Sequence, residues 1–201
     1  MHLLEKDRSV VVAVDLQGRM LSLVERSDEI IAATSGLLQL SDVFGVPVVV
    51  TEQYPRGLGP TADSVLATYE ALKVPKQRVA KTSFGCCGDA GFQAAIDAVL
   101  PEVASGDRQY VIAGIEAHIC VVQTVIELLH GADEVFVCWD CVSSRGAAYR
   151  RWGLRRMEQA GAIITNLESV GFEWARDKEH PSFREMSRLF RDGQAGVDDP
   201  V

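Results

Sequence analysis

Short runs of β-branched apolar residues alternate along this chain with longer segments in which apolar residues recur at helical spacing. The clearest runs, rich in Val and Ile, lie at 10–14, 46–50, 110–115, 135–137 and 162–164, and a weaker run at 78–80 is a candidate sixth strand. Continuous apolar strands are typical of a parallel sheet that is covered on both faces. Helix candidates lie between the runs, near 28–44, 62–72, 89–99, 118–130 and 147–160. Capping-box spacing at Thr165 and Glu168 favours a further helix after 166.

This alternation predicts right-handed βαβ units. We therefore expect a three-layer α/β/α sandwich around a six-stranded, mostly parallel, doubly wound sheet. The chain has 201 residues, of which 47% are hydrophobic, which is enough for one core. Because no repeat, linker or low-complexity block divides it, we predict a single domain over 1–190. The remaining stretch, 191–201, is rich in Gly and Asp and is expected to be a flexible tail.

Charge and cysteine content narrow the functional classes. The formal net charge is −8, so we expect no nucleic-acid partner, since binding to phosphates needs a basic surface. No run reaches the roughly 18 apolar residues of a membrane span, and residues 1–8 lack the apolar core of a signal peptide. Five cysteines in a core-rich chain favour reduced thiols and a cytoplasmic location.

Three reactive side chains follow predicted strands. Asp15 comes directly after 10–14, Lys81 directly after 78–80, and Cys120 one short turn after 110–115. In open α/β sheets the ligand crevice lies outside the carboxyl ends of the strands. We therefore expect a carboxylate, an ammonium group and a thiol to meet at one edge of the sheet.

These three groups together favour acyl transfer. A helix N-terminus at Cys120 would favour the nucleophilic thiolate, Asp15 would accept its proton, and Lys81 would balance the negative charge. Backbone N–H groups of the preceding turn would stabilise an oxyanion. Taken alone, each residue has an ordinary structural explanation: a turn cap, a solvated charge or a small buried hydrophobe.

The segments 12–17, 81–84 and 114–121 resemble the isochorismatase-like cysteine hydrolases, most closely their isochorismatase domain-containing branch. The resemblance covers roughly 9–168, and 51–55 and 140–145 also fit it. It implies a six-stranded parallel sheet between helices and a catalytic triad of Asp15, Lys81 and Cys120. It also implies a cis peptide between Ile115 and Glu116, and an oxyanion hole made by the N–H groups of Glu116 and Cys120.

Departures from the family pattern refine the expected chemistry. Nicotinamidases of the family carry metal-binding His residues after the second strand, whereas 52–57 contains none. We therefore expect no catalytic metal and no cofactor, and nicotinamide is a doubtful substrate. True isochorismatases lack the nucleophilic cysteine, so Cys120 indicates hydrolysis of a small amide or related C–N or acyl bond through a thioester. The predicted pocket walls, each of which has an equally good packing or hydrogen-bonding explanation, are Gln17, Tyr54, Phe84 and His118.

Two alternatives remain open: a non-catalytic binding or scaffold protein that keeps the fold, and a thiol redox protein that pairs Cys120 with Cys86 or Cys87. The C-x-x-C motif at Cys138 and Cys141 continues an apolar run and does not open a helix, which argues against a thioredoxin-type site. A zinc site would want a second pair of ligands, so we interpret these cysteines as structural. Because the family commonly forms oligomers, the resemblance also implies a homo-oligomer.

Overall fold

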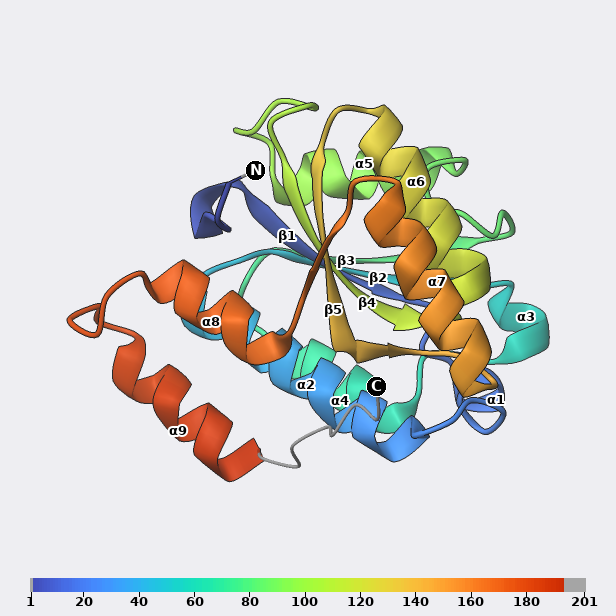
Figure 1. The fold of residues 1–201 in the computed structure, drawn as a ribbon, viewed down its shortest axis with the longest axis horizontal. Coiled ribbons are helices and arrows are strands. Elements are labelled where there is room, and N and C mark those ends of the chain that lie inside the picture. The colour runs from blue at the N-terminus through green and yellow to red at the C-terminus, as the bar shows by residue number, and fades with distance from the viewer. Residues whose placement is uncertain (1, 194–201) are drawn as a thin grey trace.

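The computed structural model describes residues 2–193, which form one parallel sheet between two layers of helices (Figure 1). The sheet has six strands in the order β3-β2-β1-β4-β5-β6, and every neighbouring pair is parallel. The predicted fold class is therefore confirmed, and the weak run at 78–80 belongs to a full strand. The strands are β1 (Ser9–Val14), β2 (Val48–Gln53), β3 (Lys76–Lys81), β4 (Gln109–Ile115), β5 (Glu134–Ser143) and β6 (Ile163–Thr165).

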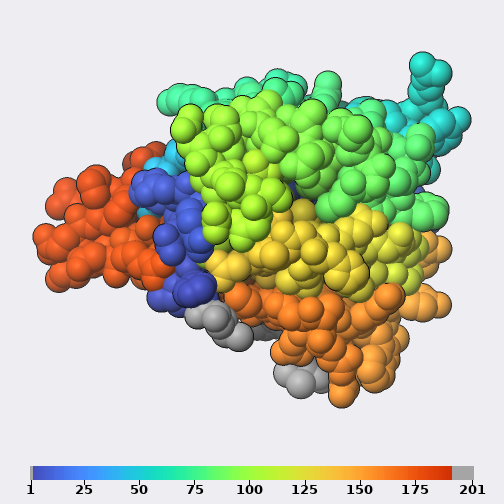
Figure 2. All heavy atoms as spheres, turned by 90° about the horizontal axis from the view of Figure 1, so that it is seen from above, coloured from blue at the N-terminus to red at the C-terminus, as the bar shows by residue number. Residues whose placement is uncertain are grey.

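The helices cover the two faces of the sheet separately. One layer contains α2 (Ser27–Phe44), α4 (Asp63–Ala71), α8 (Leu167–Ala175) and α9 (Phe183–Gly193), and the other contains α5 (Ala90–Val99), α6 (Val122–His130) and α7 (Ala147–Gln159). Figure 2 looks onto the molecule from the side of α5 and α6, where the green, yellow and orange segments lie next to one another. Short helices α1 (Gly18–Leu21) and α3 (Pro55–Leu58), the 3₁₀ turn Lys6–Arg8 and the π-helical turn η2 (Ala117–Val121) complete the chain.

The apolar strand runs form the two cores. All six residues of β1 are buried. Val11 and Ala13 pack in the core beneath α2, whereas Val10 and Val12 pack in the core beneath α5 and α6. This alternation explains why the run is apolar throughout, because successive side chains of a strand point to opposite faces.

The strand order places a switch point between β1 and β4. The chain runs from β1 outwards through β2 to β3, and then crosses back to place β4 on the other side of β1. Crevices of doubly wound sheets form outside the carboxyl ends of strands at such a point. Asp15 and Cys120 follow these two adjacent strands, so the topology supports the expected convergence.

The C-terminal prediction is only partly covered by the described residues. Helix α9 continues to Gly193, so 191–193 are helical, whereas the rest of the expected tail, 194–201, lies outside the described residues. Within residues 2–193, no helix combines the length and the apolar character needed to cross a membrane.

Candidate active site

Asp15 lies at the centre of the candidate site. It follows β1 directly, is 3% exposed, and adopts a left-handed backbone conformation with φ of 53°. Asp is among the residues that tolerate this region best, and the conformation turns the chain sharply at the end of the strand. The Asp15 carboxylate accepts hydrogen bonds from Thr51 Oγ1 and Lys81 Nζ, each at 2.7 Å.

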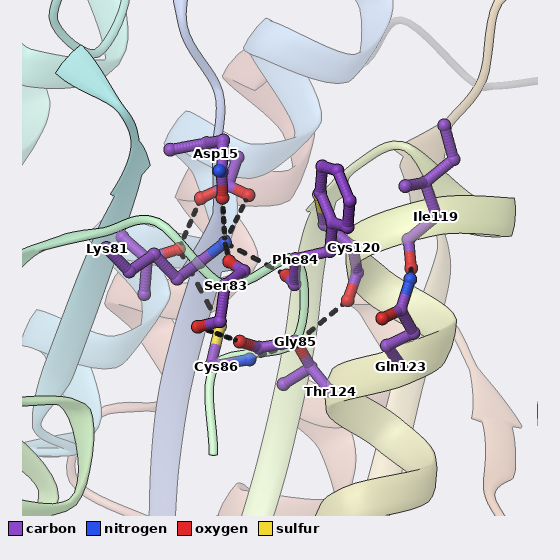
Figure 3. Close-up of polar contacts among 12 residues, drawn as sticks. Asp15, Lys81, Ser83, Phe84, Gly85, Cys86, Ile119, Cys120, Gln123 and Thr124 are labelled. Carbon is purple, nitrogen blue, oxygen red and sulfur yellow. Dashed lines mark hydrogen bonds and ion pairs between the residues drawn. The ribbon is translucent and has the colours of Figure 1, made fainter. Parts of the chain in front are cut away.

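Lys81 ends β3 and reaches across to Asp15 (Figure 3). Its side chain is fully buried, and Nζ lies 2.7 Å from Asp15 Oδ2. The ammonium group also donates to Gln53 Oε1 at 3.0 Å and to the carbonyl oxygens of Phe84 at 3.0 Å and Ser83 at 3.2 Å. This set of acceptors compensates the loss of water around a buried cation.

Cys120 lies in η2, the π-helical turn that joins β4 to α6. The residue is 8% exposed, and its carbonyl oxygen accepts a hydrogen bond from Thr124 Oγ1 at 2.8 Å. Burial raises the pKa of the Cys120 thiol to about 12; the charge of Asp15 and a hydrogen bond to it act in the same direction, and Lys81 opposes them.

The direction of this shift corrects one expectation. A helix N-terminus at Cys120 was expected to favour the thiolate, yet the pKa of the thiol is raised. Cys120 lies in a π-helical turn and α6 begins only at Val122, and burial beside a carboxylate outweighs the Lys81 cation. The surroundings of Cys120 therefore favour the thiol over the thiolate.

Close contact between β4 and β1 positions the turn that carries Cys120. Gly114 has φ of 128°, and a Cβ built there would lie 2.1 Å from the carbonyl oxygen of Val14. Only glycine fits both the conformation and the space. The next peptide, Ile115–Glu116, is cis, as the resemblance implied.

The Glu116 side chain is anchored beside this turn. Its carboxylate is nearly fully buried and accepts hydrogen bonds from the Arg145 backbone N–H at 2.9 Å and from Arg145 Nε at 3.0 Å. Burial acts to raise the Glu116 pKa, but the hydrogen bonds and charge of Arg145 hold it below its ordinary value. Glu116 is thus a fixed anion, and its ion pair ties the end of β4 to the connection between β5 and α7.

A second thiol, Cys86, belongs to the same network. Its backbone N–H donates to Thr124 Oγ1 at 3.1 Å, and its Sγ lies 3.9 Å from Thr51 Oγ1. Burial raises its pKa to about 11, and the residue is 0% exposed. All five cysteines are free thiols. Cys86 therefore supports the site from within the core and presents no sulfur to a ligand.

The four predicted pocket residues differ in their surroundings. Gln17 is buried and cross-links the chain: its amide donates to the carbonyl oxygens of Gln53 and Gly59 and its oxygen accepts from the Gln53 N–H. Tyr54 and Phe84 are 54% and 56% exposed. The Tyr54 N–H donates to the Lys81 carbonyl oxygen, and the Phe84 carbonyl oxygen accepts from Lys81 Nζ. His118 has Nδ1 3.1 Å from Ser144 Oγ and stacks on Tyr149. Gln17 thus has the contacts of a structural residue.

Sequence reasoning assigned no role to Thr51, Gln53 or Arg145, which bind the charged groups of the site. The signal was present, because 51–53 are polar residues that directly follow the apolar run 46–50 and so reach the same edge of the sheet. Two grooves of the described chain, of about 810 and 490 Å³, are lined mainly by α7 and by α2, α4 and α9 respectively. None of Asp15, Lys81 and Cys120 lines either groove.

Comparison with known proteins agrees with this architecture. The model of the Isochorismatase domain family matches residues 9–169. Isochorismatase domain-containing protein 1 of Danio rerio is 34% identical over 183 residues; the match covers 91% of this chain and 61% of that relative. The chain therefore spans less than two thirds of the length of that relative.

Solved structures show the same fold. The MAR1 ribonuclease of Caenorhabditis elegans superposes with a TM-score of 0.87 at 30% identity, covering 100% of this chain and 97% of the other. The YcaC product of Escherichia coli, described as an octameric hydrolase of unknown specificity, gives a TM-score of 0.85 at 24% identity and covers 96% of this chain and 91% of its own.

Proposed function

Because this chain belongs to the isochorismatase family of hydrolases, we propose that it cleaves a small amide or a related acyl compound with Cys120 as its nucleophile. Asp15 acts as the general base and acid, and Lys81 balances its charge. The observation that carries the proposal is the buried Asp15–Lys81 ion pair, at 2.7 Å, beside a thiol that interacts with both groups.

In the first half of the reaction, Asp15 takes the proton of the Cys120 thiol while sulfur attacks the substrate carbonyl carbon. A raised thiol pKa suits this coupling, because the proton leaves only as the C–S bond forms. The carbonyl electron pair moves to oxygen, which the N–H groups of Glu116 and Cys120 stabilise. Collapse expels the amine, which takes the proton from Asp15 and leaves a thioester on Cys120.

In the second half, Asp15 accepts a proton from water and the resulting hydroxide attacks the thioester carbonyl. Collapse of this second intermediate releases the carboxylic acid and returns the proton to sulfur. Lys81 keeps its contacts with Asp15 and the loop carbonyls at 83 and 84 throughout, so the carboxylate stays aligned. These steps use the three side chains, the two backbone N–H groups and water.

Mass spectrometry of the intact protein tests the assignment. A panel of small amides is incubated with the wild type, with Cys120→Ala and with Cys87→Ser, which removes a thiol outside the triad. We expect turnover and a trapped acyl adduct on Cys120 in the wild type and in Cys87→Ser, and neither in Cys120→Ala. Equal turnover by Cys120→Ala would refute the proposal.

The same variants, with an added mild-oxidation step, separate the alternatives. A scaffold protein would bind the compounds without turnover or adduct in any variant. A redox protein would form a reversible disulfide from Cys120 to Cys86 or Cys87 under mild oxidation.

We propose a small neutral or weakly charged substrate rather than RNA, although one structural relative is described as a ribonuclease. The formal net charge of −8 opposes binding of a polyanion, and Cys120 is only 8% exposed. Cleavage of single-stranded RNA that survives in Cys120→Ala but is lost from Lys81→Met would contradict this choice.

We also propose a homo-oligomer that works in the cytoplasm, where its five thiols stay reduced. Exposed aromatic side chains on α7, Tyr149 and Trp152, are 53% and 57% exposed and support self-association. Sedimentation velocity of the wild type and of Trp152→Gln tests this, and a concentration-independent monomer would contradict it.

A further inference from the structure

A wide irregularity in β5 brings two nearby cysteines, Cys138 and Cys141, to the same face of the sheet. The sheet register pairs Ile112 with Val137 and then Gly114 with Val142, so β5 advances five residues while β4 advances two. The three additional residues form a bulge over 138–141. Cys138 and Cys141 are three positions apart and would face opposite sides of a regular strand. Here both pack in the core beneath α2 and α8.

Asp140 completes the cluster. One ligand atom from each of Cys138, Asp140 and Cys141 lies within 4.8 Å of the other two. Among residues 2–193, this is the one group of three or more such side chains that close together. Both cysteines are 0% exposed, and Asp140 is half-buried, so the cluster has a side that faces solvent.

We propose that Cys138, Asp140 and Cys141 form a structural site for a thiophilic divalent cation such as Zn²⁺. Two thiolates and one carboxylate are ligands that Zn²⁺ accepts, and they disfavour Ca²⁺ and Mg²⁺, which require oxygen ligands. Three protein ligands leave one position of a tetrahedral cation for water or a backbone oxygen. This site is separate from Cys120 and does not depend on the proposed hydrolase activity.

The surroundings of the cluster are those of a fixed ligand set. The Asp140 carboxylate accepts hydrogen bonds from the Leu167 N–H at 3.0 and 3.1 Å, which orients it from the start of α8. Arg150 on α7 donates to the carbonyl oxygens of Trp139 at 2.6 Å and Val142 at 2.9 Å and so holds the bulge on both sides. Outer contacts of this kind orient metal ligands and raise affinity.

Binding of the divalent cation would release two protons. Both thiols lose a proton to solvent as two metal–sulfur bonds form, and the Asp140 carboxylate adds a metal–oxygen bond. No electron is transferred. The cation would bind three residues of the β5 bulge in the folded chain, and Asp140 is already held to α8 by the Leu167 N–H. Because the folded ligand set binds it better than the unfolded chain, it stabilises the fold by mass action.

Cobalt(II) and zinc(II) titrations of the reduced full-length chain test the site. With the wild type we expect one Co²⁺ per chain, with a thiolate-to-cobalt charge-transfer band that Zn²⁺ removes. Native mass spectrometry should show one zinc ion added and two protons lost. Cys138→Ser and Cys141→Ser should lose the band, whereas Cys86→Ser, Cys87→Ser and Cys120→Ala keep it.

Asp140→Asn provides a second test in case the buried cysteine variants fail to fold. Because Asp140 is only half-buried, we expect this variant to fold. We expect it to keep a weakened band, with Co²⁺ affinity lower by about tenfold or more, and a smaller rise in Tm with Zn²⁺ than the wild type shows. A wild type without band or zinc adduct overturns the proposal. So does a band that survives in Cys141→Ser or disappears in Cys120→Ala, since the ligands would then be elsewhere.

Discussion

Replacing Asp15 by asparagine should make the Cys120 thiol more acidic, although it removes the proposed general base. Burial and the Asp15 charge raise the thiol pKa to about 12, and Lys81 opposes them. The substitution removes the charge that opposes ionisation and leaves the cation in place. The thiolate should therefore become more accessible while hydrolysis is lost.

The size of the effect can be estimated from Coulomb's law for two neighbouring charges. Two unit charges about 4 Å apart interact by about 4 kcal/mol at an effective dielectric constant of about 20. Since one pKa unit corresponds to about 1.4 kcal/mol, loss of the Asp15 charge should lower the thiol pKa by roughly 2–3 units. At pH 8 the thiolate fraction, and with it the alkylation rate, should then rise by about 100-fold or more.

Iodoacetamide labelling measures this directly. The rate of Cys120 modification is followed across pH by mass spectrometry of peptides cut after glutamate, because cleavage after Glu116 and Glu127 leaves Cys120 on a peptide without the other four cysteines. Wild type should show a log rate that climbs with pH up to about 12, whereas for Asp15→Asn the rate should bend near pH 9–10 and level off above it. Asp63→Asn, a change to an exposed carboxylate on α4, serves as the matched control and should behave like wild type.

The reasoning is refuted if Asp15→Asn folds, by its circular dichroism spectrum, and yet alkylates at the wild-type rate or more slowly. Asp15 would then not be the group that keeps the proton on sulfur. The mechanism in which it accepts that proton would lose its basis.

Three further predictions concern stability. The pKa of Cys120 is raised on folding from 9.0 to about 12, so its stabilising contribution is present below pH 9 and is lost as pH rises towards 12; urea titrations should show a loss of up to about 1.4 kcal/mol per pH unit that Cys120→Ala lacks. An equal alkaline slope in both proteins would contradict this. Gly114→Ala should cost about 3 kcal/mol or more because its Cβ meets Val14, whereas Gly45→Ala, with φ of 75° and no atom within 4 Å, should cost about 1 kcal/mol; equal melting temperatures would exclude the clash. Lys81→Met leaves a buried carboxylate unpaired and should lower the free energy of unfolding by about 3–5 kcal/mol and abolish turnover, and a stable, active variant would show that the pair is dispensable.

Sequence patterns determined the architecture of this protein. The Val- and Ile-rich runs were enough to predict the strands, because a strand covered on both faces must be apolar at every position. Because residues that follow parallel strands meet at the carboxyl edge of the sheet, the sequence placed Asp15 and Lys81 together. The structure has Lys81 Nζ 2.7 Å from Asp15 Oδ2. Both inferences use local chemistry and a general rule of topology, so they needed no coordinates.

Only the tertiary structure decided the pKa of the Cys120 thiol and the placement of Cys138 and Cys141 on one face of the sheet. The pKa of Cys120 depends on burial and on a carboxylate 105 positions away in the chain, neither of which helical spacing reveals. Cys138 and Cys141 share one face only because β5 carries three more residues than β4 over the same stretch. The raised pKa of Cys120 and the bulge in β5 both depend on neighbours that are distant in the sequence. They therefore arise only when the sheet has formed.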